Sequence, residues 1–66
     1  MNITLNGDKK ELPDSITLKD AVEKVCSNPD GVVAELNREI IRKDKWQKKL
    51  LKDGDILELI AFMGGG

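Results

Sequence analysis

The sequence predicts an α+β fold in which one main helix packs on one face of a mixed sheet of about five strands. Two observations predict it. Several short stretches alternate apolar and polar residues, as strands do, and a single stretch with helical spacing lies between the second and the third of them. The chain has 66 residues, which is enough for one small domain. We place this domain at residues 1–63, followed by a glycine tail at residues 64–66.

The first two strands are expected to form a hairpin. Met1, Ile3 and Leu5 alternate with polar residues, and Asn6-Gly7 follows them directly. Asparagine and glycine tolerate the positive φ angles of a type I′ turn, so the return strand is expected at Lys9 to Leu12.

The helix is expected to begin after Thr17, an N-cap residue with Asp20 three positions later. An apolar stripe at i, i+3, i+4 and i+7 would pack against the hairpin; it consists of Leu18, Ala21, Val22 and Val25. The helix should end within residues 27–31, because the residue before Pro29 avoids the helical region and Gly31 permits a turn.

Two further strands follow the helix. In the first, residues 32–36, the face without Glu35 is expected to be buried; it consists of Val32, Ala34 and Leu36. The second is short, contains Ile40-Ile41 and is reached by a tight turn.

The last strand is predicted at Ile56 to Phe62, after a turn at Asp53-Gly54-Asp55. Alternation divides it into two faces. The face toward the helix consists of Leu57, Leu59 and Ala61, and the opposite face of Ile56, Glu58, Ile60 and Phe62. One helix covers only one face of a sheet, so Ile60 and Phe62 are expected to be exposed, and exposed apolar patches tend to mark partner surfaces.

The segment Arg38 to Lys52 is the most basic, with seven basic and two acidic residues. Its apolar residues scatter around a helical wheel, which argues against a long helix. A single helical turn near Lys43 to Trp46 fits better. We interpret the lysines as a solvated edge, with a basic docking patch as the alternative. Nucleic-acid binding is disfavoured, because Trp46 and Phe62 are the only aromatic residues.

Composition excludes several kinds of chemistry. There is no histidine, and the single cysteine, Cys26, has no partner for an intramolecular disulfide; we interpret it as a small core residue rather than a nucleophile. Charged residues make up 35% of the chain but nearly cancel to a net charge of −1. With no stretch suited to a signal peptide or a membrane span, we expect a cytoplasmic protein without a membrane or nucleic-acid partner.

The chain ends on Gly64, Gly65 and Gly66. Glycine has no Cβ and stabilises neither helix nor strand, so these residues add little to the fold. A tail without side chains can instead enter a narrow cleft of another protein and present its carboxylate there. The alternative is a frayed terminus.

These features together resemble the ThiS family. The features are the Asn6-Gly7 hairpin, the strand from Val32 to Asn37 followed by Glu39-Ile40-Ile41, the Lys45-Trp46 pair, the Asp53-Gly54-Asp55 turn, and the apolar strand that runs into a terminal Gly-Gly. The resemblance implies a ubiquitin-like β-grasp fold with the first and last strands parallel at its centre. Two departures are Arg38, where many members have glycine, and the third terminal glycine.

The resemblance also implies a function. ThiS proteins are sulfur carriers of thiamin biosynthesis, so this chain would be a protein cosubstrate, not an enzyme, and would bind no cofactor itself. An E1-like adenylyltransferase (ThiF-like) would use ATP and magnesium to adenylate the carboxylate of Gly66. A sulfurtransferase or cysteine desulfurase would supply sulfur for a thiocarboxylate, and a thiazole synthase (ThiG-like) would receive it.

The same resemblance assigns roles to residues near the terminus. Gly64 and Gly65 would thread into the partner enzymes, and the docking residues would be Glu58, Ile60, Phe62 and Met63. The free carrier would be a monomer. Two alternatives stay open: a carrier of the same chemistry for molybdopterin or another sulfur acceptor, and a β-grasp interaction or RNA-binding module that makes no use of its terminal carboxylate.

Overall fold

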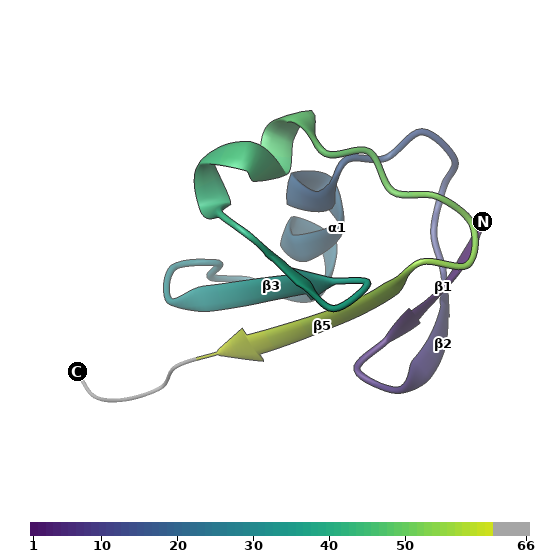
Figure 1. The fold of residues 1–66 in the computed structure, drawn as a ribbon, viewed down its shortest axis with the longest axis horizontal. Coiled ribbons are helices and arrows are strands. Elements are labelled where there is room, and N and C mark those ends of the chain that lie inside the picture. Colours follow the sequence, from purple (N-terminus) through teal and green to yellow (C-terminus); the bar gives the residue numbers. More distant parts are fainter. Residues whose placement is uncertain (62–66) are drawn as a thin grey trace.

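The structure, a computed structural model, describes residues 1 to 61 of the chain (Figure 1). Their elements are β1 (Asn2–Leu5), β2 (Asp8–Glu11), α1 (Leu18–Val25), β3 (Val32–Leu36), β4 (Glu39–Ile41), the 3-10 helix η1 (Lys43–Lys48) and β5 (Ile56–Ala61). The predicted order of two strands, one helix and three strands is confirmed. Phe62, the predicted last residue of the final strand, lies outside the described residues.

The strands form one sheet in the order β2-β1-β5-β3-β4. β1 and β5 are parallel, and the other neighbouring pairs are antiparallel. Both helices lie on one side of this sheet (Figure 1). This is the β-grasp arrangement, with the first and last strands side by side, and the expected fold is confirmed. None of the helices within residues 1–61 is long and apolar enough to cross a membrane.

The first hairpin turns at Asn6 and Gly7, whose φ angles are 49° and 87°. Two positive φ angles in succession characterise a type I′ turn, as predicted. The sequence predicts the return strand at Lys9 to Leu12, but it begins at Asp8, which pairs with Leu5, and ends at Glu11. The two-residue turn sets this register. Leu12 lies beyond the strand, with its side chain in the core.

Helix α1 begins as predicted, because the Oγ1 of Thr17 accepts a hydrogen bond from the backbone N–H of Asp20 at 3.2 Å. Leu18, Ala21 and Val22 are buried. Val25, expected to complete the apolar stripe, is 37% exposed. The helix ends at this residue, and the chain then becomes extended.

The second hairpin has the same turn geometry with a different residue pair. Asn37 has a φ of 51° and Arg38 a φ of 72°. Arg38 therefore occupies a left-handed conformation that favours glycine. The turn forms despite the arginine, and the face of β3 without Glu35 is buried as predicted.

The basic segment folds around Trp46. Its 3-10 helix η1 covers Lys43–Lys48, which is longer than the single turn predicted but far shorter than the segment itself. Trp46 is buried, and its Nε1 donates a hydrogen bond to the carbonyl of Ile41 at 2.8 Å. A buried indole N–H needs such an acceptor. The tryptophan thus joins the end of β4 to the core beneath η1.

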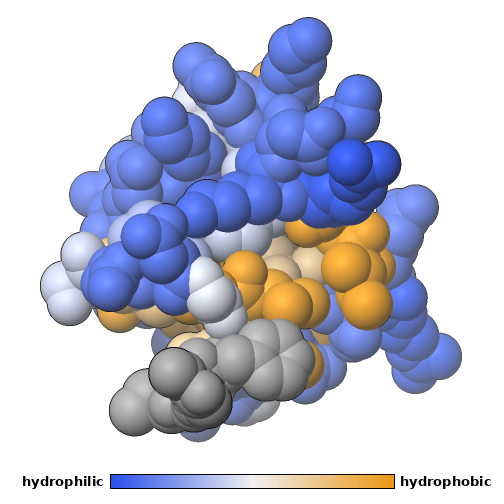
Figure 2. Space-filling view, turned by 90° about the vertical axis from the view of Figure 1, so that its left-hand side faces the viewer, coloured by the Kyte–Doolittle hydropathy of each residue, from blue (hydrophilic) through white to orange (hydrophobic). Residues whose placement is uncertain are grey.

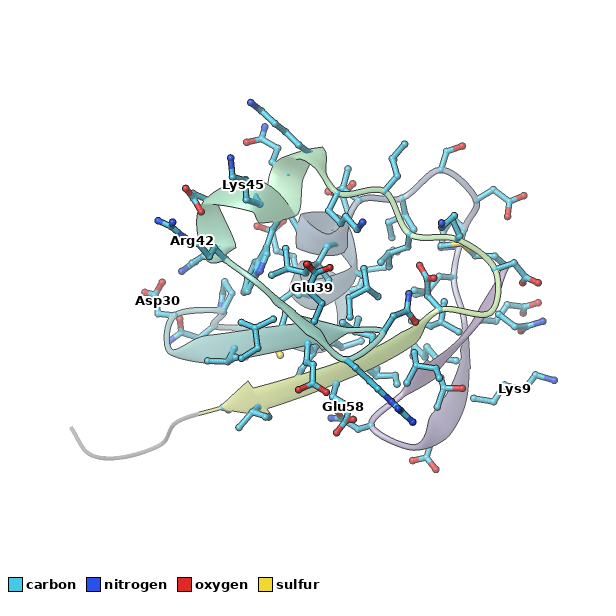
Figure 3. The ribbon with its side chains drawn as sticks, in the orientation of Figure 1. Lys9, Asp30, Glu39, Arg42, Lys45 and Glu58 are labelled. Atoms are coloured by element: carbon cyan, nitrogen blue, oxygen red, sulfur yellow. The ribbon has the colours of Figure 1, made fainter. Side chains whose placement is uncertain are left out.

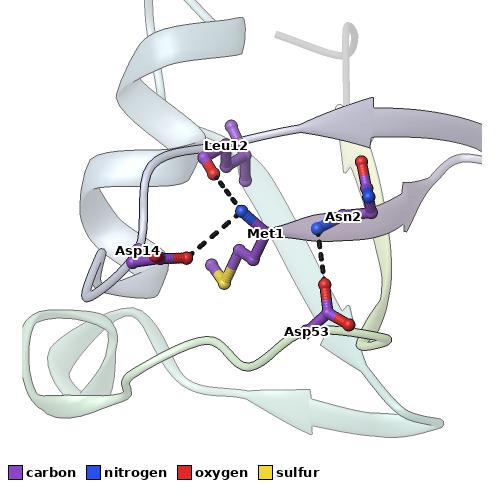
Figure 4. A network of polar contacts seen from close by, with 5 residues as sticks. All are labelled: Met1, Asn2, Leu12, Asp14 and Asp53. Atoms are coloured by element: carbon purple, nitrogen blue, oxygen red, sulfur yellow. Dashed lines mark hydrogen bonds and ion pairs between the residues drawn. The ribbon is translucent and has the colours of Figure 1, made fainter.

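The start of β5 is fixed to the start of β1 (Figure 4). The backbone N–H of Asn2 donates to Oδ1 of Asp53 at 2.7 Å, and the N–H of Gly54 donates back to the carbonyl of Asn2 at 2.8 Å. Beside them, the ammonium of Met1 donates to the carbonyl of Leu12 at 2.7 Å and lies 3.2 Å from Asp14. The two bonds of Asn2 with Asp53 and Gly54 set where the last strand enters the sheet.

Candidate functional site

Strand β5 presents one face to the core and one to solvent, as alternation requires. Leu57 is buried and Leu59 half-buried on the helix side. On the other side Ile56 is 50% exposed, Ile60 is 48% exposed, and Glu58 is exposed. Figure 3 shows Glu58 projecting from β5 away from α1. The exposure expected for Ile60 is therefore found, and its role in docking stays a prediction.

The neighbouring strands extend this exposed face, which we call the open face. Val33 lies opposite Ile60, and Ile40 lies opposite Glu35. Ile40 is 65% exposed. Figure 2 views the end of the molecule where β5 ends and shows apolar surface gathered there below a hydrophilic rim. A patch of this kind beside the last described strand residues suits contact with another protein.

Two carboxylates face each other within the open face. Glu35 and Glu58 are direct cross-strand partners, and neither belongs to an ion pair within residues 1–61. Like charges directly opposite one another destabilise a sheet. A positively charged side chain of a partner placed between them would relieve this repulsion.

The beginning of β5 is held by a polar network that the sequence interpretation did not predict. Asn37 Oδ1 accepts from the N–H of Ile56 at 2.9 Å, and Asn37 Nδ2 donates to Oδ1 of Asp55 at 3.0 Å. Asp55 is buried, and its Oδ2 accepts from the N–H of Lys52 at 2.7 Å. Turn chemistry predicted the bend, but no sequence signal marked Asp55 as a buried carboxylate.

The other side of β5 is held by Asn6, at the point where β1 ends. The N–H of Asn6 donates to the carbonyl of Leu57 at 2.9 Å. Its side-chain Oδ1 accepts from the N–H of Leu59 at 2.8 Å. The strand that leads to the glycine tail is therefore fixed along both edges as far as Leu59.

Cys26 is half-buried and packs against the core, as its interpretation as a small core residue predicts. It also borders an uncharged groove of about 350 Å³ next to the end of β5, which is lined by Leu5, Asn6, Val25, Cys26, Val32, Leu59 and Ala61. No cluster of three histidine, cysteine, aspartate or glutamate residues within residues 1–61 is arranged to hold a metal ion.

The basic residues form an exposed edge around η1, where Figure 3 shows Arg42 and Lys45. Arg42 lies 3.5 Å from Asp44, and Lys43 Nζ donates to Oδ1 of Asp30 at 2.9 Å. This hydrogen bond, with the attraction of the lysine charge, lowers the pKa of Asp30. The exposed geometry is that of a solvated edge, and the alternative of a docking patch stays open.

Five predicted site residues lie outside the described residues: Phe62, Met63, Gly64, Gly65 and Gly66. The structure brings the remaining two, Glu58 and Ile60, together on the open face, on the strand that leads to the tail.

The chain matches the model of the ThiS family over residues 3–66. It is 35% identical to the sulfur carrier protein ThiS of Bacillus subtilis over 65 residues, which cover 97% of this chain and 98% of that protein. The crystal structure of the thiamine biosynthesis protein ThiS from Geobacter metallireducens superposes with a TM-score of 0.87, at 30% identity and with both chains fully covered.

A longer protein also contains a similar segment. The chain is 32% identical over all 66 residues to part of a thiazole synthase of Paramagnetospirillum magneticum, and it spans 20% of the length of that protein.

Proposed function

The chain belongs to the ThiS family, and from this premise we propose that it is a sulfur carrier of thiamin biosynthesis that bears sulfur on its C-terminal carboxylate. The observation that carries the proposal is the family match over residues 3–66, which includes the terminal glycines. The chain acts in this proposal as a protein cosubstrate, and the catalytic groups belong to its partners.

The proposed chemistry begins at Gly66. A carboxylate is a poor electrophile, so an E1-like adenylyltransferase transfers AMP from ATP to it and releases pyrophosphate. ATP and magnesium are bound by that enzyme. A persulfide from a sulfurtransferase then attacks the acyl carbon and displaces AMP. The product is an acyl–S–S–Cys link between Gly66 and the donor. A second thiol of the donor attacks the cysteine sulfur of this link, forms a disulfide with that cysteine, and releases the thiocarboxylate on Gly66.

The described surface fits this role. Glu58 and Ile60 lie exposed on β5, five or fewer residues before Phe62 and Met63, and we propose that these four residues dock onto the adenylating enzyme. Ile60 supplies apolar contact. The facing carboxylates of Glu35 and Glu58 favour a partner that places a lysine or arginine against them. Gly64 and Gly65 then reach the reactive centre without steric obstruction.

We propose a thiazole synthase as the acceptor of the sulfur. The support is the similarity of the whole chain to a segment of a thiazole synthase, because domains that work together are often joined in one chain. This similarity, with that to the ThiS protein of Bacillus subtilis, favours a thiazole precursor over molybdopterin as the product.

Intact-mass measurement tests the carrier proposal. The purified chain is incubated with the ThiF-like adenylating enzyme of the same organism, ATP, magnesium and a sulfurtransferase with its sulfur source. We expect a mass increase equal to the replacement of one oxygen by sulfur. A chain synthesised with a C-terminal amide is the matched control, because it keeps every side chain and lacks only the carboxylate. An unchanged mass of the unmodified chain with an active enzyme would overturn the proposal.

A further inference from the structure

Strand β5 extends beyond the strand that pairs with it on one side (Figure 1). The β1–β5 register consists of Thr4 with Ile56 and Leu5 with Leu57. On the opposite side β3 pairs with β5 as far as Ala61. The last residues of β5 therefore have a neighbouring strand on one edge only, within the part of the chain that the structure describes.

The hydrogen bonds identify which backbone groups point to the free edge. Ile56 donates toward Asn37, on the β3 side, whereas Leu57 and Leu59 bond to Asn6, on the β1 side. The direction in which the backbone N–H and C=O groups point alternates from residue to residue along a strand. The backbone groups of Ala61 therefore point to the same edge as those of Leu57 and Leu59. The carbonyl of Leu59 and the N–H of Ala61 thus face the place where β1 would continue.

The side chain of Asn6 completes the last regular position of this ladder. In a parallel pair, a residue donates its N–H to a carbonyl of the opposite strand. Its own carbonyl accepts from the N–H of the residue two positions further along that opposite strand. Asn6 donates its N–H to Leu57 in this way, but its Oδ1 replaces the backbone carbonyl as acceptor for Leu59. The chain then turns back into β2, which leaves the next position of the ladder without a strand from residues 1–61.

The uncharged groove lies beside this open position. Its seven lining residues include Leu59 and Ala61 from β5, Leu5 from β1 and Val25 from the end of α1. None carries a charge, although 35% of the chain is charged. A strand that takes the open position would place alternate side chains toward this groove, and those side chains would have to be uncharged.

We propose that an extended segment of the sulfur-accepting enzyme adds as a strand to the free edge of β5 and packs its apolar side chains into the uncharged groove. One residue of this segment donates its N–H to the carbonyl of Leu59 and accepts from the N–H of Ala61, which repeats the pattern of Asn6. Its alternate side chains face the side of Glu58, where basic groups are favoured. The inference rests on the proposed function, since it takes the partner to be a thiazole synthase.

This strand addition differs from docking on the open face. It uses main-chain groups at the edge of the sheet, immediately before the segment that contains the glycines. Pairing here would align the segment before the tail with a strand of the enzyme, so that the direction in which the tail enters is set by backbone hydrogen bonds.

Amide hydrogen exchange tests the pairing directly. Exchange at Ala61 is measured by NMR in the free chain and in the chain saturated with the thiazole synthase of the same organism. We expect exchange at Ala61 to slow in the complex, while exchange at Lys9 does not change. Lys9 is the control because it lies in β2, an edge strand of the same sheet that does not neighbour β5. Unchanged exchange at Ala61 in a saturated complex would overturn the inference.

Backbone methylation supplies a second test. A synthetic chain with N-methyl-Ala61 loses the donor and blocks the approach of a strand, so its affinity for the thiazole synthase should fall roughly tenfold or more. N-methyl-Lys9, in the edge strand β2, is the matched control and should bind like the unmodified chain. Equal affinity of both methylated chains would contradict strand addition.

Side-chain variants test the groove. Val25→Gln introduces a polar group at the groove, and Lys24→Gln places the same residue one position earlier, outside its lining. Only the first should weaken binding. Failure of the unmodified chain to bind the thiazole synthase at all would also overturn this inference. The mass measurement with the adenylating enzyme would then still decide the carrier proposal separately.

Discussion

Asn6 and Asn37 hold opposite edges of the same strand. The Oδ1 of Asn6 accepts from the N–H of Leu59, and the Oδ1 of Asn37 accepts from the N–H of Ile56. Each asparagine is the first residue of a two-residue hairpin turn and has a positive φ angle. The two turns therefore do more than reverse the chain, since their side chains place β5 between its neighbours.

Replacing Asn37 by glycine tests this role, because glycine keeps the turn geometry and removes only the side chain. The N–H of Ile56 and the carboxylate of Asp55 would each lose a partner. We expect the free energy of unfolding to fall by about 1–3 kcal/mol, measured by urea denaturation with the fluorescence of Trp46. Asn2→Gly is the control. Asn2 is exposed in β1, and its side chain makes no hydrogen bond within residues 1–61 of the structure. Equal losses at both positions would argue against the network.

Replacing Arg38 by glycine should stabilise the protein. Its φ of 72° lies in a region that is strained for arginine, by roughly 1–2 kcal/mol, and glycine removes this strain. The greater freedom of glycine in the unfolded chain offsets roughly 0.5–1 kcal/mol of the gain. We therefore expect a net increase of about 0.5–1 kcal/mol in the free energy of unfolding. A loss of stability would show that the arginine side chain makes a compensating contact.

The pair Ile60→Asp and Ile56→Asp tests docking on the open face. Both isoleucines lie on the same face of β5 and are about equally exposed, but Ile60 is nearer the tail. We expect Ile60→Asp to weaken binding to the adenylating enzyme by roughly tenfold, and Ile56→Asp to have a much smaller effect. Calorimetry measures both affinities. If both variants weakened binding equally, the contact would extend across the whole open face. If neither variant weakened binding, Ile60 would be excluded from docking.

Glu58→Gln should affect stability and binding in opposite directions. Removing one of two facing carboxylates relieves repulsion, so the free chain should gain about 0.2–1 kcal/mol in the free energy of unfolding. Binding to the adenylating enzyme should weaken and become less sensitive to salt. Glu23→Gln, on the exposed surface of α1, should change neither property. A Glu58→Gln variant that binds more tightly would contradict a basic partner.

The ion pair between Lys43 and Asp30 should influence stability at acidic pH. The hydrogen bond from Lys43, together with its charge, lowers the pKa of Asp30 in the folded chain. The resulting stabilisation is present above the pKa of the unfolded chain and is lost as pH falls through the lower folded pKa. Lys43→Gln should raise the pKa of Asp30 toward its ordinary value, which an NMR pH titration measures. Arg42→Gln, which alters the separate pair with Asp44, should leave it unchanged.

The fold could be predicted from the sequence largely because its signals are local. Asn6-Gly7 predicts its turn, and alternating residues predict which face of β3 is buried. The predicted boundary of β2 differs from the structure by one residue, because pairing across a two-residue turn, not the identity of Asp8, decides where the strand begins. The side-chain bonds to β5 could not be predicted. The bond from Leu59 to Asn6 joins residues 53 positions apart, and no local pattern reports such a contact.

The candidate site was predictable only in part. Alternation and the single helix were enough to expect Ile60 on an exposed face. The free edge of β5 could not be foreseen, since it depends on where β1 ends relative to β5, a relationship that appears only once the register is known.

The position of β5 between β1 and β3 also has a mechanical consequence. A pull on the end of β5 would act along this strand and therefore lengthwise on the bonds to both neighbouring strands. Bonds loaded in shear must break together, whereas bonds at an edge that is peeled away break one at a time. The bonds of β5 to β1 and β3 would therefore resist tension on the end of the strand together.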